Sequence, residues 1–318
     1  MNSAPAIAVV LFESRGYLDA LLKSLRAQTV VAQPWAFCIN GPDDGAAEFL
    51  RSQAEQIFVT ERPDNPGFAG GANAAMALLE RDGASPEFIL LLNPDVELSA
   101  DYLEHGLEVF NHHPEVGAVG GLLWRENATG AEVVDSAGFA LQPWLRIVDR
   151  GAGRDLASWR EPSGSVIGVC AAAILMRSAA LRDVAEDGKA FDESFWMYKE
   201  DQDLCLRLRG RGHQVFFEPA ARARHQRGWA PKIGARAGIA GKLRQHSLKN
   251  RYLLMAKHWD WRQLWRFPLI LVFELFLGLL LLVSEPRTLR AYPMAARLWP
   301  TAWRKGRAFA KRRLSTAW

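Results

Sequence analysis

The residues best suited to chemistry follow an apolar run over positions 90–92, which stops abruptly at Asn93-Pro94-Asp95. This order predicts a carboxylate and an amide at the carboxyl end of a buried strand. In open α/β sheets ligands bind at that edge, because the loops that leave it line a crevice. Carboxylate and amide oxygens suit a hard divalent cation that holds phosphates. The alternative is a proline turn in which Asp95 only caps the next helix.

A second group of carboxylates opens an expected helix over residues 200–210. Glu200 and Asp201 follow four aromatic or sulfur-containing side chains at positions 195–198. The helix dipole favours acids in a first turn, and that effect alone could explain them. An apolar wall beside a carboxylate also raises its affinity for a proton, which suits general-base catalysis. Farther along, His225 is a candidate metal ligand or phosphate contact, although a lone histidine is more often neither.

The chain around these residues alternates between strand-like and helix-like patterns, as doubly wound α/β folds do. Apolar runs predict strands over residues 7–12, 35–39, 57–59, 88–92, 116–123, 166–176 and 214–217. Periodic apolar positions predict helices over 17–28, 46–54, 200–210 and an alanine-rich stretch ending near 81, after a glycine-rich loop over 65–71. Residues 124–165 are expected to be rich in loops. Their tryptophans could form an acceptor-side wall or serve packing alone.

Length and composition limit the class of protein. The 318 residues, 49% apolar and 23% charged, suffice for one large α/β domain with an appendage, or for two domains. The three cysteines form no CxxC pair, which argues against a disulfide framework or a zinc site and fits a reducing compartment. The N-terminus has no basic segment before its apolar run, so no secretory signal is expected.

Charge is distributed unevenly along the chain. Residues 1–225 hold 20 Lys and Arg against 32 Asp and Glu, a net charge of −12. Residues 226–318 hold 19 against 3, a net charge of +16. A basic tail on an acidic body predicts a polyanionic partner for the tail, either nucleic acid or an anionic membrane.

The tail also contains an apolar run over residues 267–283, interrupted by Glu274. At seventeen residues it is marginal for spanning a bilayer, which takes about 20. Arginines flank it, and beyond it cations alternate with Trp299, Trp303 and Phe309. Interleaved cations and aromatic rings favour a helix that lies in a membrane interface over one that spans the bilayer. The alternative is a core-packed hairpin with a solvated basic face.

In joint order and spacing, these motifs resemble the family-two inverting glycosyltransferases of the GT-A fold, and most closely the bacterial rhamnosyltransferase-like branch that acts on lipid-linked or cell-surface glycans. The resemblance covers residues 1 to about 228 and rests on residues 65–73 (NPGFAGGAN), 91–95 (LLNPD), 191–193 (FDE) and 200–208 (EDQDLCLRL), followed by His225. A tail with Asn250-Arg251-Tyr252 and a hydrophobic, then basic, run also resembles that branch. The resemblance implies a Rossmann-like, mostly parallel sheet flanked by helices over residues 1–228. Residues 229–318 would form a helical, basic, membrane-associating region.

The resemblance also implies roles for the candidate residues. Asp95 looks like the principal metal ligand of the family's Asp-x-Asp motif, with Asn93 in place of the first Asp, and the implied cofactor is Mg²⁺ or Mn²⁺. Asp201 matches the catalytic base, Glu200 would position the acceptor, and His225 resembles a further metal ligand.

Contacts with the nucleotide sugar are implied for Phe12, Glu13, Asn40, Gly67, Phe68, Gly70, Asn73 and Asn93. In two places the chain departs from the family. It has Leu11-Phe12-Glu13 where the family often has Thr-Tyr-Asn, and Ile39 where an Asp commonly meets the base. These departures leave the identity of the nucleotide open.

The expected activity is therefore metal-assisted transfer of a sugar, with rhamnose from a dTDP donor as the working guess, to a lipid-linked or polysaccharide acceptor. We expect attachment to the cytoplasmic face of the inner membrane through its anionic surface, and no nucleic-acid partner. Two alternatives stay open, a non-catalytic nucleotide-sugar-binding scaffold and a basic-tailed nucleic-acid-binding protein. The acceptor, the linkage and the oligomeric state are not predicted.

Overall fold

The computed structural model describes residues 4–81, 86–226 and 236–314, with side chains described outside 236–240. Its strands are β1 (Ala6–Leu11), β2 (Trp35–Ile39), β3 (Ile57–Glu61), β4 (Phe88–Leu92), β5 (Val96–Leu98), β6 (Val116–Glu126), β7 (Glu132–Ser136), β8 (Phe139–Leu141), β9 (Ile147–Asp149), β10 (Gly164–Val166), β11 (Ala173–Arg177) and β12 (Gln214–His225). Its helices are α1 (Leu18–Arg26), α2 (Ala46–Arg51), α3 (Gly67–Leu79), α4 (Tyr102–His112), α5 (Ser178–Val184), α6 (Glu200–Gly210), α7 (Arg236–His258), α8 (Phe267–Ser284) and α9 (Ala291–Ala310), with short 3-10 turns η1 (Arg15–Tyr17), η3 (Glu193–Phe195), η4 (Trp261–Arg266) and η5 (Pro286–Arg290).

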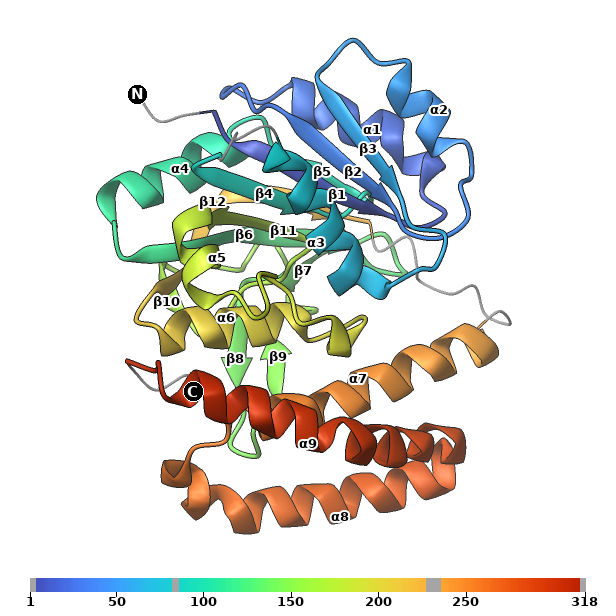
Figure 1. The fold of residues 1–318 in the computed structure, drawn as a ribbon, viewed down its shortest axis with the longest axis vertical. Coiled ribbons are helices and arrows are strands. Elements are labelled where there is room, and N and C mark those ends of the chain that lie inside the picture. Colours follow the sequence, from blue (N-terminus) through green and yellow to red (C-terminus); the bar gives the residue numbers. More distant parts are fainter. Residues whose placement is uncertain (1–3, 82–85, 227–235, 315–318) are drawn as a thin grey trace.

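One mixed sheet organises the first two thirds of the chain. Its main order is β10-β12-β6-β11-β4-β1-β2-β3, with β5 added to β12 and β7 added to β6. The strands β1, β2, β3 and β4 run parallel, while β11 is antiparallel to both β4 and β6. β1, β2 and β4 are buried along their whole length, which is why they are continuously apolar instead of alternating. Helices pack on both faces (Figure 1), so two apolar cores form, one on each face.

The predicted fold class, a mostly parallel α/β sheet flanked by helices with a helical tail, is confirmed. The bounds predicted for β2, β4 and α6 match the structure. Three expectations were wrong. Residues 166–176 form two strands, β10 and β11, joined by a loop, and β12 runs on to His225 instead of ending at residue 217. Helix α3 begins at Gly67, within the stretch expected to be a loop. Pro66 stands at the N-cap position, where the missing N–H of proline does not interrupt the hydrogen bonds of the helix.

Three long helices follow the sheet. In Figure 1, α7 lies beneath α6, α9 runs along α7, and α8 is outermost. The α7–α9 approach is close, since a Cβ on Gly306 would lie 2.2 Å from the carbonyl oxygen of Lys257. Glycine is therefore required at that crossing. The predicted boundary between residues 228 and 229 falls within 227–235, outside the described residues, so the division into two domains stays a prediction.

Candidate active site

Asp95, His225 and Asp135 lie together beyond the carboxyl end of β4. The antiparallel register of β5 and β12 pairs Val96 with His225, and this places the histidine next to Asp95. His225 Nε2 is 3.5 Å from Asp95 Oδ1, and Nδ1 is 2.8 Å from Asp135 Oδ2. Asp135 is buried and also accepts a hydrogen bond from Arg125 Nε at 3.0 Å. The result is a carboxylate–histidine–carboxylate row, with Asp95 at its outer end.

The electrostatics of this row follow from its composition. Burial disfavours the charged imidazole, but hydrogen bonds to Asp135 and Asp95 outweigh that effect and raise the pKa of His225 to about 9. A proton and a divalent cation therefore compete for Nε2. A carboxylate that holds Nδ1 while Nε2 faces outward is the usual support of a metal-ligating histidine. A carboxylate oxygen beside an imidazole nitrogen thus fits a divalent cation at Asp95 and His225.

Asp201 lies in the first turn of α6, and its carboxylate is half-buried. It accepts hydrogen bonds from the backbone N–H groups of Ala171 at 3.3 Å and Gln202 at 2.8 Å. Burial raises its pKa, the two hydrogen bonds oppose this, and nearby Asp149 adds to the rise, so that the pKa is about 6. This carboxylate is ionised near neutral pH and still has a useful affinity for a proton.

The loop between β10 and β11 joins the two carboxylate groups. Ala171 donates to Asp201, and the next residue, Ala172, accepts a hydrogen bond from the N–H of Asn93 at 2.9 Å. The candidate metal-binding motif and the candidate base therefore approach the same short loop from two sides. This juxtaposition is what a reaction between two bound substrates requires.

Glu200 precedes Asp201 but faces a different environment. It is buried, and among the described residues its Oε2 has no hydrogen-bond partner. Burial, together with the charge of Asp201, raises the pKa of Glu200 well above its usual range. The uncharged form of this side chain is therefore favoured. Its role in positioning the acceptor stays a prediction.

The predicted nucleotide contacts at the ends of the first two strands lie side by side. Asn40 follows β2, and its N–H donates to Leu11 O at 2.7 Å. Its side chain is buried, and Oδ1 has no hydrogen-bond partner among the described residues. Phe12 packs against Gly41, where a Cβ would lie 2.9 Å from the ring. Glu13 is exposed with φ +47°, so it projects from this edge.

The predicted glycine motif is the first turn of α3 and packs against protein. Gly67 has φ +75°, and a Cβ there would lie 2.2 Å from Trp196 O. Gly70 faces Pro66, and Phe68 meets Phe191 edge to face at 6.3 Å. Asn73 exchanges hydrogen bonds with the backbone of Phe191. Close packing of α3 on the 191–196 segment thus explains these residue types, independently of any nucleotide.

The segment before Asp201 has an unusual backbone that α7 holds in place. Trp196, Tyr198 and Lys199 have positive φ values of 64°, 70° and 67°. Asn250 Nδ2 donates to the carbonyl oxygens of Phe195, Met197 and Tyr198 at 2.9, 2.8 and 2.6 Å. Such conformations persist only where the surroundings fix them. The tail therefore supports the geometry of the candidate base.

The carboxylates of Glu186, Asp192 and Asp203 form a separate buried group, with oxygens within 4.8 Å of one another. Lys257 Nζ of α7 lies 2.8, 2.8 and 2.9 Å from them. Arg207 Nε also contacts Asp203 at 2.9 Å. Because the side chains of the chain itself supply this positive charge, we assign no metal to the group. Asp203 thus has basic neighbours, as expected for a structural residue.

Sequence reasoning missed two carboxylates of the site. Asp135 orients His225 from β7, and Asp149 at the end of β9 raises the pKa of Asp201. Both lie in the region 124–165, whose sequence has no recognisable motif. The one available signal was a lone acid within or at the end of a short strand, and that pattern is too common to single out a residue.

The match to a known family covers the part of the chain that holds Asp95 and Asp135 and ends before Asp201 and His225. Residues 6–184 match the family model described as glycosyl transferase family 2. The chain belongs to this family. The prediction of an enzyme, a glycosyltransferase of inverting family two, is thereby confirmed. The N-acetylglucosaminyl-diphospho-decaprenol L-rhamnosyltransferase of Mycobacterium tuberculosis is 24% identical over 290 residues, covering 85% of this chain and 89% of that protein.

Solved structures agree with this fold. The mannosyltransferase PcManGT from Pyrobaculum calidifontis, in complex with GDP-Man and Mn²⁺, has a TM-score of 0.55 at 16% identity, covering 98% of this chain and 84% of that one. GalNAc-T7 with UDP, GalNAc and Mn²⁺ has a TM-score of 0.58 at 10% identity. The matched part covers 82% of this chain and 49% of that one. At these identities the likeness concerns the fold, and it confirms the GT-A architecture.

Proposed function

We propose that this glycosyltransferase transfers a sugar, rhamnose in the first instance, from a nucleoside-diphosphate donor to a lipid-linked sugar acceptor at the cytoplasmic face of the membrane. The observation that carries the proposal is the meeting of Asp201 and the Asn93-Pro94-Asp95 motif at one loop. The rhamnosyltransferase relative, which covers most of this chain, supports the choice of sugar and acceptor.

The proposed metal ligands are Asp95 and His225. Mg²⁺ or Mn²⁺ held there would offset the negative charge that develops on the departing nucleoside diphosphate. Asp135 keeps the His225 ring in the required orientation through Nδ1. Asn93 would contact the ribose or act through water, and its N–H is already committed to Ala172.

The proposed base is Asp201. In a transfer with inversion, the acceptor hydroxyl oxygen forms a bond to the anomeric carbon while the bond to the diphosphate oxygen breaks. The electron pair leaves with the diphosphate, and the hydroxyl proton passes to the Asp201 carboxylate. A half-buried carboxylate whose pKa is about 6 suits this step.

The pKa of Asp201 makes a prediction for the pH dependence. A base must be deprotonated to act, and burial raises its pKa to about 6. The transfer rate, measured as kcat/KM for the acceptor, is therefore expected to be constant above about pH 7 and to fall tenfold per pH unit below about 6. Stopped assays between pH 5 and 8.5 at saturating Mn²⁺ measure this profile. A rate that stays constant down to pH 5 would contradict the assignment.

Membrane attachment is proposed for α8. Residues Trp261–Ser284 are long and apolar enough to cross a bilayer by length and composition, and the most apolar 18-residue window in them has a mean hydropathy of 2.5. Ten large apolar side chains of α8 are 45–84% exposed, and Ile270 and Leu281 are its buried ones. Transfer of such side chains out of water contributes on the order of 1 kcal/mol each. Together they suffice to hold the chain at a bilayer.

An interfacial position is favoured over a spanning one. Glu274, at the middle of α8, pairs with Arg251 and Tyr252 of α7. A spanning helix would have to leave α7 and carry Glu274 without these partners into hydrocarbon, which is costly. The exposed arginines Arg262, Arg287 and Arg290 at the two ends of α8 suit anionic headgroups.

Replacing Val272 and Phe276 with glutamate tests the attachment. Both side chains are exposed, at 67% and 64%, so the fold should be unchanged in water. We expect vesicle binding to fall at least about tenfold, because apolar area is lost and two acids face the headgroups. Flotation with vesicles containing phosphatidylglycerol measures this. Val31→Glu, at a 71% exposed site in the linker before β2, is the control. Equal flotation of the double variant would exclude α8 as the anchor.

A direct assay tests the function and its scaffold alternative together. The purified chain is incubated with nucleotide sugars, dTDP-rhamnose first, a prenyl-diphosphate-linked N-acetylglucosamine acceptor and Mn²⁺. We expect glycosylated lipid product, and we expect its loss when EDTA replaces the metal. Full activity in EDTA would remove the metal assignment. Absence of both transfer and donor hydrolysis with every donor would favour the non-catalytic scaffold.

A further inference from the structure

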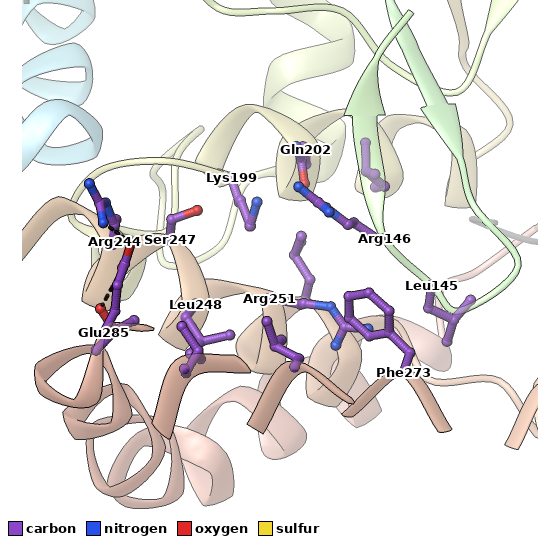
Figure 2. Close-up of a pocket in the computed structure, with 15 residues that line it drawn as sticks. Leu145, Arg146, Lys199, Gln202, Arg244, Ser247, Leu248, Arg251, Phe273 and Glu285 are labelled. Atoms are coloured by element: carbon purple, nitrogen blue, oxygen red, sulfur yellow. Dashed lines mark hydrogen bonds and ion pairs between the residues drawn. The ribbon is translucent and has the colours of Figure 1, made fainter. Parts of the chain in front are cut away.

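A pocket of about 320 Å³ lies between the start of α6, the turn that joins β8 to β9, and helices α7 and α8. Figure 2 shows Lys199, Gln202 and Arg146 on one side of it, with Leu248, Arg251 and Phe273 on the other. Lys199 and Gln202 are close neighbours of Asp201 in the chain. Asp201 does not line the pocket itself, but its charge acts on Lys199, which does. The pocket thus lies near the candidate base, between the start of α6 and the helical tail.

One side of the pocket is cationic. Arg146 from the β8–β9 turn and Lys199 from the start of α6 both line it. Neither side chain forms an ion pair with any other residue that the structure describes. Burial lowers the pKa of Lys199, an effect that the nearby Asp201 charge opposes, so an anion in the pocket would stabilise its charged form. Arg251 lines the pocket on the opposite side.

The other side is largely apolar and leads toward the proposed membrane surface, and its charged residues Arg251, Arg244 and Glu285 are in ion pairs. Leu248 and Leu254 of α7, with Phe273, Leu277 and Leu281 of α8, form this wall. Phe273 stacks on Trp144 at 5.5 Å, which fixes the wall to the β8–β9 turn. The same helix, α8, presents its other faces to solvent. An apolar chain that leaves the pocket along α8 would thus remain in contact with apolar side chains.

A ligand with an anionic end and a long hydrocarbon matches these two walls. We propose that this pocket binds the diphosphate and the first prenyl units of a polyprenyl-diphosphate-linked sugar. The diphosphate contacts Arg146 and Lys199, and the prenyl units contact Leu248, Phe273 and Leu277. This assignment rests on the proposed function, because it places the sugar attached to the diphosphate next to Asp201. The donor's diphosphate is expected at Asp95 instead, on the far side of the Ala171–Ala172 loop.

The experiment uses the full chain and farnesyl diphosphate as a soluble probe, with inorganic diphosphate and farnesol as its two halves. Arg146→Gln removes an exposed cation, and Leu277→Gln changes the apolar wall. For Arg146→Gln we expect affinity for farnesyl diphosphate and for inorganic diphosphate to fall about tenfold. For Leu277→Gln we expect weaker binding of farnesyl diphosphate and of farnesol, with inorganic diphosphate unchanged. Calorimetry measures all three ligands.

Matched controls are Lys23→Gln on α1 and Val31→Gln, which remove an exposed cation and an exposed apolar side chain far from the pocket. Thermal unfolding of each variant establishes that it folds. Wild-type affinities in both pocket variants would overturn the proposal. A rise in the KM for the nucleotide sugar in Arg146→Gln, with farnesyl diphosphate binding unchanged, would assign the pocket to the donor and also overturn it.

Failure of the proposed function gives a different result. If no nucleotide sugar is hydrolysed or transferred while farnesyl diphosphate still binds and responds to both variants, the pocket assignment holds and the transferase function falls. If transfer proceeds but the variants leave the KM for a prenyl-linked acceptor unchanged, the function holds and the pocket assignment falls.

Discussion

Replacement of Asp201 with asparagine is expected to lower kcat for sugar transfer about 10²–10⁴-fold, the contribution of one positioned general base. Asparagine keeps the shape of the side chain and can still accept the hydrogen bond from Gln202 N–H, which is 2.8 Å long in the native chain. It cannot accept a proton at neutral pH. The loss should therefore appear in kcat, while donor binding in the presence of Mn²⁺, measured by thermal shift, stays near the native value.

The control for this variant is Asp155→Asn. Asp155 also accepts a backbone hydrogen bond, from Ser158 N–H at 2.9 Å, but it lies in an exposed loop. The activity of Asp155→Asn should equal that of the native chain. The residual activity of Asp201→Asn should also lose the decline below about pH 6, because the titrating group is gone. Near-native turnover in this variant would remove Asp201 as the base and would favour a water-mediated or substrate-borne acceptor of the proton.

The sequence predicts the sheet well because its parallel strands are buried on both faces. Continuous apolar runs such as β2 and β4 have bounds that burial alone determines. The sequence predicts an element poorly where contacts with residues distant in the chain decide its structure. Residues 166–176 have strand-like composition throughout, but residues 167–172 leave the sheet to form the loop that contacts Asp201 and Asn93. Composition does not encode that departure.

In the candidate site, too, the sequence identifies the residues with a local pattern and misses those that depend on a distant partner. Asp95 and Asp201 are found because each lies within a motif with a fixed local geometry, a strand end and a helix start. Asp135 and Asn250 act through partners about 90 and 50 residues away along the chain, His225 and the 195–198 segment. A long-range partner leaves no local pattern in one sequence. The sequence singled out the glycines in the first turn of α3 as nucleotide contacts. The structure explains Gly67 by its close packing against Trp196.

A buried ion network joins the tail to the sheet domain near the candidate base. Lys257 of α7 contacts Asp203 of α6 and Asp192, which accepts a hydrogen bond from Ser194 in η3. Asp203 lies two residues after the candidate base. The network therefore fixes the start of α6 and the segment that leads into it. Loss of its central cation should affect both stability and activity.

Replacement of Lys257 with methionine is expected to destabilise the chain by about 3–5 kcal/mol, because it removes the cation that three neighbouring carboxylates share and leaves Arg207 and Lys305 to offset them. The Lys257 side chain is 1% exposed. Burial raises the pKa of Asp192, but Lys257 and Lys305 outweigh it and lower this pKa to about 2 in the native chain. A depressed folded-state pKa gives stability that is present above the unfolded value near 4 and is lost only as the pH falls through about 2. The native chain should therefore keep this contribution between pH 8 and pH 5.

In Lys257→Met these carboxylates lose the cation that they share, so their pKa values rise and protonation relieves their mutual repulsion at lower pH. The stability gap to the native chain, measured by urea unfolding, is expected to narrow from pH 8 to pH 5. The control is Lys189→Met, whose ion pair with Glu193 is 51% and 36% exposed, and whose loss should cost about 0.2–1 kcal/mol. The difference in the free energy of unfolding could instead be small, or the same at both pH values. Either result would mean that packing of α7 and α9, and not this charge, holds the tail in place.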